Sequence, residues 1–277
     1  MKIPEELKRE AMPLADAMHR VRMDSSIQGS DVDELIQQLP GSLASAPAFL
    51  CAVDNAWRYE YGLPYTDTVG APLALGTDQN PEVRVLLRGL LKVSRHASRA
   101  DLQTYISKLA NEDKHFDHLA ELDPVLRAKE LTQLEYEPRP LGERSRGPDW
   151  AMRFSDGSAA LVEVKSRIKE LLGLLLSLRR GEDPSPHATR VPLLSGLLDS
   201  VCSKFPACES ASSRLQGVWV YSPVSFIEEE VQTLFDGLEA DKVHFLVVGH
   251  GWREYEALTR SSDVGVRLAQ RFSLPGI

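Results

Sequence analysis

The residues best suited to chemistry lie within one short segment, GPDWAMRFSDGSAALVEVKSR, which covers residues 147–167. Asp149 stands near its start, Glu163 and Lys165 stand near its end, and alternating apolar and polar side chains between them predict a β-hairpin. Two carboxylates held close together repel by up to about 4 kcal/mol at about 4 Å and an effective dielectric of about 20. A proton, a basic side chain such as Lys165 or a divalent cation must compensate, and Mg²⁺ is typically held by one or two carboxylates plus water.

The loop length of this hairpin decides which side chains share a face. A two-residue turn would put Asp149 and Glu163 on opposite faces. A three-residue loop over 155–157, with Gly157 in the left-handed region, would bring Asp149 directly across from Glu163, with Lys165 two residues further along. We predict the three-residue loop because it alone also gives an unbroken apolar face, made of Trp150, Met152, Phe154, Ala160, Val162 and Val164.

The elements that must position this hairpin form a mixed α/β pattern from about residue 112 onwards. We expect a helix over 113–131, interrupted or restarted at Asp123-Pro124, and then a strand over 132–138. After the hairpin, the pattern predicts an apolar helix at about 167–180, strands over 217–221 and 242–248, and further helices over 193–205, over 226–238 and at the C-terminal end. The predicted order is therefore helix, three strands, helices, strand, helix, strand.

The first ~110 residues are predicted to be mostly helical and irregular, with loops rich in Gly, Pro, Ser and Thr. Pro81 at a first helical position opens a helix over 81–96. Ser98 and Asp101 have the spacing of a capping box before the next helix. We therefore divide the chain into a helical N-terminal region, 1–110, and an α/β domain, 111–277.

Pro148-Asp149, followed after a hairpin by Glu163-Val164-Lys165, resembles the signature of the PD-(D/E)XK nuclease superfamily, which includes many restriction endonucleases. The predicted element order over residues 112–250 is also similar to the αβββαβ core of that fold. The weight of the resemblance comes from placement on a hairpin between helices, because Glu-x-Lys also occurs at Glu6-Leu7-Lys8 and Glu112-Asp113-Lys114. The resemblance implies a restriction-endonuclease-like core, a mixed sheet flanked by helices, after the helical N-terminal region.

The resemblance implies a metal-dependent endonuclease that hydrolyses phosphodiester bonds, with DNA as the expected substrate. Asp149, Glu163 and the backbone carbonyl of Val164 would hold Mg²⁺, or Mn²⁺ as its substitute, and Lys165 would position or activate the attacking water and offset charge in the transition state. Family members often add an acidic residue from the preceding helix. Glu121 is the first candidate for this position and Glu130 is the alternative.

Arginines near the hairpin are the candidate phosphate contacts. Residues 139–190 carry ten basic and seven acidic side chains, a net charge of +3, whereas the whole chain has a net charge of −8. We expect nucleic-acid contacts from Arg144, Arg146 and Arg167, with further arginines at Arg139, Arg179 and Arg180. The acidic overall balance argues against nucleic-acid binding through bulk electrostatics alone.

Three other interpretations stay open at this point. The fold could carry a catalytically silent binding module, either a protein-interaction or an immunity-type protein, with a protein partner at the acidic N-terminal region. The chain could instead be a nuclease subunit that is active only within a larger complex. A homodimer is left open as an assembly of the chain with itself. Lys165 could also simply neutralise two surface acids without a metal.

Further signals in the sequence are weaker. His115 and His118, with Asp113 and Asp117, could form a helical metal cluster, but a solvated helix face is the preferred interpretation because a further zinc ligand is not evident. Cys202 and Cys208 are predicted to be free thiols. The absence of a long apolar run and of a secretion signal predicts no membrane span and a cytoplasmic location.

Overall fold

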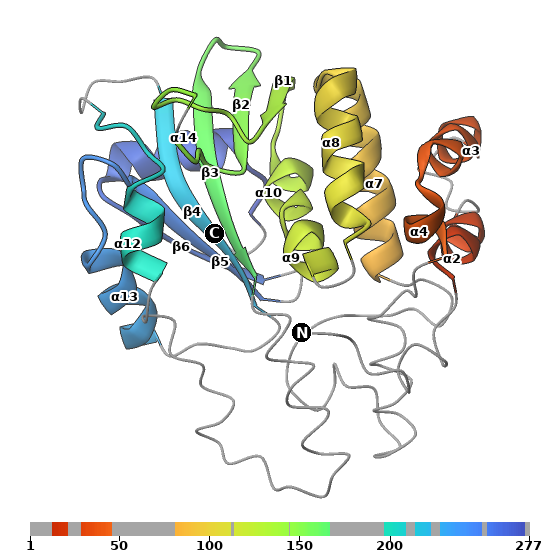
Figure 1. Cartoon of the computed structure of the whole chain (residues 1–277). Coiled ribbons are helices and arrows are strands. Elements are labelled where there is room, and N and C mark those ends of the chain that lie inside the picture. The colour runs from red at the N-terminus through yellow and green to blue at the C-terminus, as the bar shows by residue number, and fades with distance from the viewer. Residues whose placement is uncertain are drawn as a thin grey trace, which may run out of the picture.

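The computed structural model describes residues 13–21, 29–45, 81–111, 114–143, 145–166, 197–208, 214–222, 228–250 and 254–274. These residues form an α/β protein in which helices flank a six-stranded mixed sheet, as Figure 1 shows. The α/β class and the mixed sheet are therefore confirmed. Within the described ranges, no helix is both long enough and apolar enough to cross a membrane.

The six strands lie in the sheet in their order along the chain. The first three form an antiparallel meander, the third to fifth run parallel, and the sixth is antiparallel to the fifth. Their bounds are β1 Leu131–Tyr136, β2 Trp150–Phe154, β3 Ala159–Ser166, β4 Arg214–Ser222, β5 Phe245–His250 and β6 Glu254–Thr259. The central strand β3 thus joins the antiparallel and parallel halves.

The described helices fall into two groups, one on each face of the sheet (Figure 1). The first group lies on the side of the face that bears Trp150. It comprises α7 Pro81–His96, α8 Arg99–Leu109, α9 His115–Ala120, α10 Leu122–Arg127 and α14 Ser262–Arg271. It also includes α2 Leu14–Val21, α3 Gly29–Gln38 and α4 Gly41–Ala44, of which α2 and α3 pack on α7 and α4 packs on α2. The second group covers the opposite face and comprises α12 Leu197–Cys202 and α13 Glu228–Asp236.

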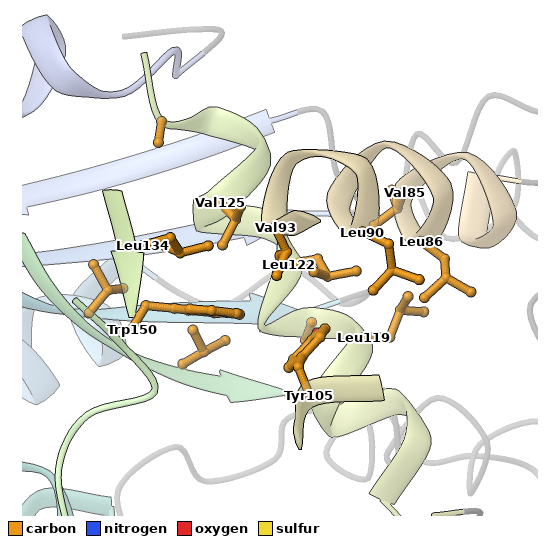
Figure 2. Close-up of a cluster of buried hydrophobic side chains, with 14 of the residues drawn as sticks. Val85, Leu86, Leu90, Val93, Tyr105, Leu119, Leu122, Val125, Leu134 and Trp150 are labelled. Carbon is orange, nitrogen blue, oxygen red and sulfur yellow. The ribbon is translucent and has the colours of Figure 1, made fainter. Parts of the chain in front are cut away.

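The larger core lies between the first group of helices and the sheet. Figure 2 shows Leu90 of α7, Tyr105 of α8 and Leu122 of α10 within the same buried cluster as Trp150 of β2. Helix α7 approaches α10 closely at Gly89, where a Cβ atom would lie 2.7 Å from Leu122 Cδ1. The buried cluster runs across residue 110 without a break, while the division of the chain at that point stays a prediction.

The smaller core covers the other face of β3, β4 and β5. Leu161 of β3 packs there with Val218 of β4 and Leu246 of β5, beneath Val201 of α12 and Leu234 of α13. Interior strands of this kind are buried on both faces, so they are apolar along their length. A charged side chain on this face of β3 is therefore covered by protein instead of facing water.

The hairpin has the predicted register. Trp150 pairs with Val162 in the antiparallel ladder, and the Phe154 N–H donates to the Ser158 carbonyl at 3.0 Å. Gly157 has a φ of +81°, the left-handed conformation that a three-residue loop requires. The three-residue loop over 155–157 is thus confirmed.

Other predicted elements were partly right. Helix α7 has the predicted bounds, and the Ser98 hydroxyl accepts a hydrogen bond from the Asp101 N–H at 3.1 Å, as the capping spacing predicted. The predicted helix over 113–131 instead divides at Glu121 into α9 and α10, two residues before Asp123-Pro124. The apolar helix predicted at 167–180 lies outside the described residues.

The sequence prediction missed the edge strand β6 and placed the preceding strand too early. β5 begins at Phe245, three residues later than predicted, and β6 follows it where only a terminal helix was expected. Strand β6 reads EYEALT, and two glutamates in six residues weaken the apolar alternation on which strand prediction depends. Its hairpin pairing with β5, from His250 opposite Glu254 to Phe245 opposite Thr259, is what makes this segment a strand.

Candidate functional site

The hairpin brings Asp149 and Glu163 to the same position along the sheet. Asp149 directly precedes β2, and one further step of the observed register places it across from Glu163. The Val164 N–H donates a hydrogen bond to Asp149 Oδ2 at 2.7 Å, so the backbone of β3 holds the Asp149 side chain. The predicted juxtaposition of the two acids is therefore present.

Val164 contributes a backbone oxygen to the same place. The N–H and C=O groups of one strand residue point toward the same neighbouring strand. Because the Val164 N–H points to Asp149, the Val164 carbonyl points to the same edge of β3. Strand β2 begins only at Trp150, so it does not cover this part of the edge. One carboxylate and one carbonyl oxygen are thus available beside Glu163.

Glu163 is the most buried acid of the site, with only 1% of its surface exposed. Two ammonium groups contact the same oxygen, Oε1: Lys165 Nζ lies at 2.6 Å and Lys204 Nζ at 2.5 Å. The other oxygen, Oε2, is buried and has no hydrogen-bond partner among the described residues. Among the described residues, the carboxylate is therefore compensated on the Oε1 side only.

Glu121 lies at the junction of α9 and α10, on the other side of the hairpin from Lys204. Its backbone carbonyl accepts a hydrogen bond from Trp150 Nε1 at 2.7 Å, which ties it to the residue after Asp149. The Tyr136 hydroxyl donates to Glu121 Oε2 at 2.9 Å, and His118 Nδ1 lies 2.8 Å from Oε1. Each carboxylate oxygen of Glu121 thus already has a partner.

An aromatic cluster explains why Glu121 is poorly solvated. The rings of Tyr105, Tyr136 and Trp150 pack with centroids 4.8 to 5.2 Å apart, and Figure 2 shows Tyr105 and Trp150 in this core. Burial raises the pKa of Glu121 to about 8, the charge of Glu163 adds to the rise, and the Tyr136 hydroxyl opposes it. Glu121 therefore holds a proton at neutral pH when no cation is bound.

Burial and neighbouring charges also shift the pKa values of Asp149, Lys204 and His118. Burial, reinforced by the charges of Glu163 and Glu121, raises the pKa of Asp149 well above its ordinary value. Burial alone would lower the pKa of Lys204, but the charges of Glu163 and Asp149 more than offset it, so its pKa is raised. Burial lowers the pKa of His118 to about 4, so its ring is neutral at pH 7.

These residues fit a small divalent cation better than a larger metal cluster. Among the residues that the structure describes, no group of three or more His, Cys, Asp and Glu side chains is arranged to hold a metal ion. Mg²⁺ needs fewer protein ligands, because it keeps several waters and takes one or two carboxylates. The hard oxygens of Asp149, Glu163 and Val164 match that requirement, and Glu163 Oε2, which has no partner among the described residues, is an oxygen that a cation would satisfy.

The remaining predicted site residues lie elsewhere or outside the described residues. Glu130 lies at the opposite end of the hairpin, where Ser155 Oγ donates to its Oε2 at 2.7 Å. Arg146 is exposed in the connection between β1 and β2, and Arg139 Nη1 donates to the Glu143 carbonyl at 2.7 Å. Nucleic-acid contact by the arginines stays a prediction. The arginines that lie outside the described residues are Arg144, Arg167, Arg179 and Arg180.

The interpretation of His115 and His118 as a solvated helix face was wrong. His115 is 1% exposed and its Nδ1 lies 2.9 Å from the Leu109 carbonyl, while His118 contacts Glu121. The physical reason is that α9 is a short helix packed between α8 and β3, so little of it faces solvent. The predicted cluster also included Asp117 and Asp113, and Asp113 lies outside the described residues.

Sequence reasoning missed three residues that contact the acids: Lys204, Tyr136 and His118. Tyr136 ends the apolar alternation of β1, which indicates burial but not its hydroxyl contact. His118 precedes Glu121 by three residues, a helical spacing that could have suggested the pair. No local signal identifies Lys204, because it lies 41 residues from Glu163 along the chain.

Comparison of the chain with models of known protein families, with curated proteins and with solved structures found no match.

Proposed function

We propose that this chain is a metal-dependent endonuclease that hydrolyses phosphodiester bonds, with DNA as the substrate. The observation that carries the proposal is the site around Glu163, where two carboxylates meet across the hairpin and Glu163 Oε2 is buried without a partner in the described structure. Buried polar atoms are nearly always satisfied, so such an oxygen calls for a ligand. A divalent cation is the ligand that also relieves the repulsion between the two acids.

The order of the elements supports the same proposal. Helix α10, strands β1, β2 and β3, helix α12 and strand β4 follow one another in the described chain, which is the αβββαβ order of the PD-(D/E)XK fold. Glu163 and Lys165 lie in the third strand, β3, and Asp149 directly precedes the second strand, β2, which is similar to the placement of the signature in that superfamily.

In the proposed reaction, Asp149, Glu163 and the Val164 carbonyl hold the cation. When bound, Mg²⁺ or Mn²⁺ stabilises charge on the phosphodiester and makes a coordinated water more acidic. Lys165 lies two residues beyond Glu163 on the same face of β3, where its ammonium can orient the attacking water and offset negative charge. The aromatic cluster around Tyr136 and Trp150 excludes bulk water on the Glu121 side.

Cleavage assays and calorimetry test this proposal together. Purified protein should nick or cut plasmid DNA in Mg²⁺ or Mn²⁺, and Lys165→Met should lower the rate at least about 100-fold, because mutations of such charge-stabilising groups have effects of that size. Titration calorimetry should show Mn²⁺ binding that Asp149→Asn and Glu163→Gln each abolish. Arg146→Gln, an exposed change outside the acidic pair, provides the control for metal binding.

The proposal fails if plasmid, linear DNA and RNA all remain intact across Mg²⁺ and Mn²⁺ titrations while Mn²⁺ binding is absent. Mn²⁺ binding that survives both Asp149→Asn and Glu163→Gln would equally contradict the assigned ligands.

A catalytically silent binding module is the second candidate, and the two lysines on Glu163 Oε1 favour it. Lys165 and Lys204 already compensate this carboxylate, as in a purely structural ion-pair cluster. Calorimetry separates the candidates, because a silent module would bind no Mn²⁺ at Asp149 and Glu163. Activity that appears only with a partner protein would instead indicate a nuclease subunit.

A further inference from the structure

Lys204 reaches the site from an element that the hairpin signature does not include. It follows α12, on the face of the sheet that carries the smaller core, and its side chain is only 18% exposed. Lys165 approaches Glu163 along the same strand. The two ammonium groups therefore come from different parts of the chain and meet at one carboxylate oxygen.

This arrangement brings two ammonium groups to a single oxygen of Glu163. Lys165 Nζ and Lys204 Nζ lie 2.6 and 2.5 Å from Oε1, so they are separated from each other by at most about 5 Å and repel. Glu163 can neutralise only one of them, and Asp149, across the hairpin from Glu163, is the other acid at this position. The second ammonium is thus placed to meet another anion at the same position.

The free side of Glu163 points to what changes when a cation binds. Oε2 is buried and has no hydrogen-bond partner in the described part of the chain, while Oε1 takes both lysines. A cation on this carboxylate would take over the charge compensation that the two lysines now share. At least one ammonium would then be released toward the place where the phosphodiester must lie, beside the metal and Lys165.

We propose that Lys204 is a second substrate-binding lysine: it pairs with Glu163 in the metal-free protein and contacts a phosphate of the nucleic acid once a cation occupies Glu163. This inference rests on the proposed function. Lys204 should therefore compete with the metal, because the Lys204 ammonium and the cation compensate the same carboxylate, that of Glu163. A lysine that only holds α12 against β3 would have no such competition.

The test uses Lys204→Gln, which removes the charge, Lys204→Arg, which keeps it, and Lys242→Gln as a matched control. Lys242 forms an ion pair with Glu239 at 2.7 Å outside the site. Removing a positive charge so near the ligand should tighten Mn²⁺ binding about tenfold or more in Lys204→Gln by calorimetry. Binding of a labelled DNA duplex in Ca²⁺, followed by fluorescence anisotropy, should weaken about fivefold to tenfold. Lys204→Arg and Lys242→Gln should stay within about twofold of the wild-type protein in both assays.

Tighter Mn²⁺ binding together with weaker DNA binding in Lys204→Gln distinguishes this role from a structural one. Loss of a purely structural lysine would weaken both affinities or neither. Unchanged or weaker Mn²⁺ binding in Lys204→Gln, with wild-type binding intact, overturns this inference and leaves the proposed function standing. A wild-type protein that binds no Mn²⁺ overturns both.

A structure of the wild-type protein with Mn²⁺ provides a test that does not depend on the folding of any variant. The expected result is that Lys204 Nζ moves beyond 4 Å from Glu163 Oε1, the limit of an ion pair. Mn²⁺ bound at Glu163 with Lys204 still on Oε1 would overturn the inference.

Discussion

Asp149→Asn should stabilise the metal-free protein, although it removes a proposed metal ligand. Two like charges at about 4 Å and an effective dielectric of about 20 repel by up to about 4 kcal/mol. Burial and the charge of Glu163 raise the pKa of Asp149, so Asp149 relieves part of this repulsion by taking up a proton, and we expect a gain of about 1–2 kcal/mol in the free energy of unfolding. The asparagine oxygen can still accept the Val164 N–H, so the hairpin keeps that contact.

Glu163→Gln should have the opposite effect. It leaves Lys165 and Lys204, with side chains 25% and 18% exposed, facing an amide in place of a carboxylate. Removing one partner of a buried ion pair leaves uncompensated charge and typically costs about 3–5 kcal/mol, and partial exposure here reduces the expected cost to about 2–3 kcal/mol. The two substitutions thus predict shifts of opposite sign from neighbouring acids on one hairpin.

Urea denaturation at pH 7 in the presence of EDTA measures both shifts, with the slope of each transition checked for two-state behaviour. Asp156→Asn in the exposed hairpin loop is the control, because it alters the Arg271 ion pair and not the site. Saturation with Mn²⁺ at about 100 times its Kd should then stabilise the wild-type protein by about 2.7 kcal/mol and neither site variant.

A loss of stability in Asp149→Asn as large as that in Glu163→Gln would refute the reasoning. The acids and lysines would then form a balanced ion-pair cluster, in which each carboxylate stabilises the fold and no cation is needed.

Three further predictions concern pH, packing and a buried acid. Burial raises the pKa of Glu121 from 4.5 to about 8, so the folded protein keeps a proton that the unfolded chain has lost. Through Glu121, stability without metal should therefore fall as the pH rises from 4.5 to about 8, by up to about 5 kcal/mol. Glu121→Gln should make the slope shallower by that amount in urea titrations, while the raised pKa of Asp149 keeps a slope of the same sign; parallel wild-type and variant curves would contradict the prediction. Gly217→Ala would place a Cβ atom 2.5 Å from the carbonyl oxygen of Phe245, and thermal unfolding should show a loss of about 1–3 kcal/mol, which an unchanged Tm would exclude. Asp123→Ala should cost about 3–5 kcal/mol because it orphans Trp219 Nε1, which donates to Asp123 Oδ2 at 2.8 Å, and a loss below 1 kcal/mol would show that the contact is dispensable.

The hairpin register and several local elements could be predicted from the sequence because their causes lie within a few residues. Alternation along 150–154 and 159–166 allows a single apolar face only when the loop has three residues, and Gly157 supplies the left-handed conformation. Pro81 and the Ser98 cap likewise act within one helical turn. The meeting of Asp149 and Glu163 follows from the same local rule.

The environment of those acids was decided by tertiary contacts. Burial of Glu163 depends on α12, which also delivers Lys204, and burial of Glu121 depends on the break between α9 and α10. Periodicity in a sequence reports which face of an element is apolar, but it carries no information on what packs against that face. The identity of the acidic pair is therefore a local property, whereas the pKa values of the acids and the second lysine are properties of the assembled fold.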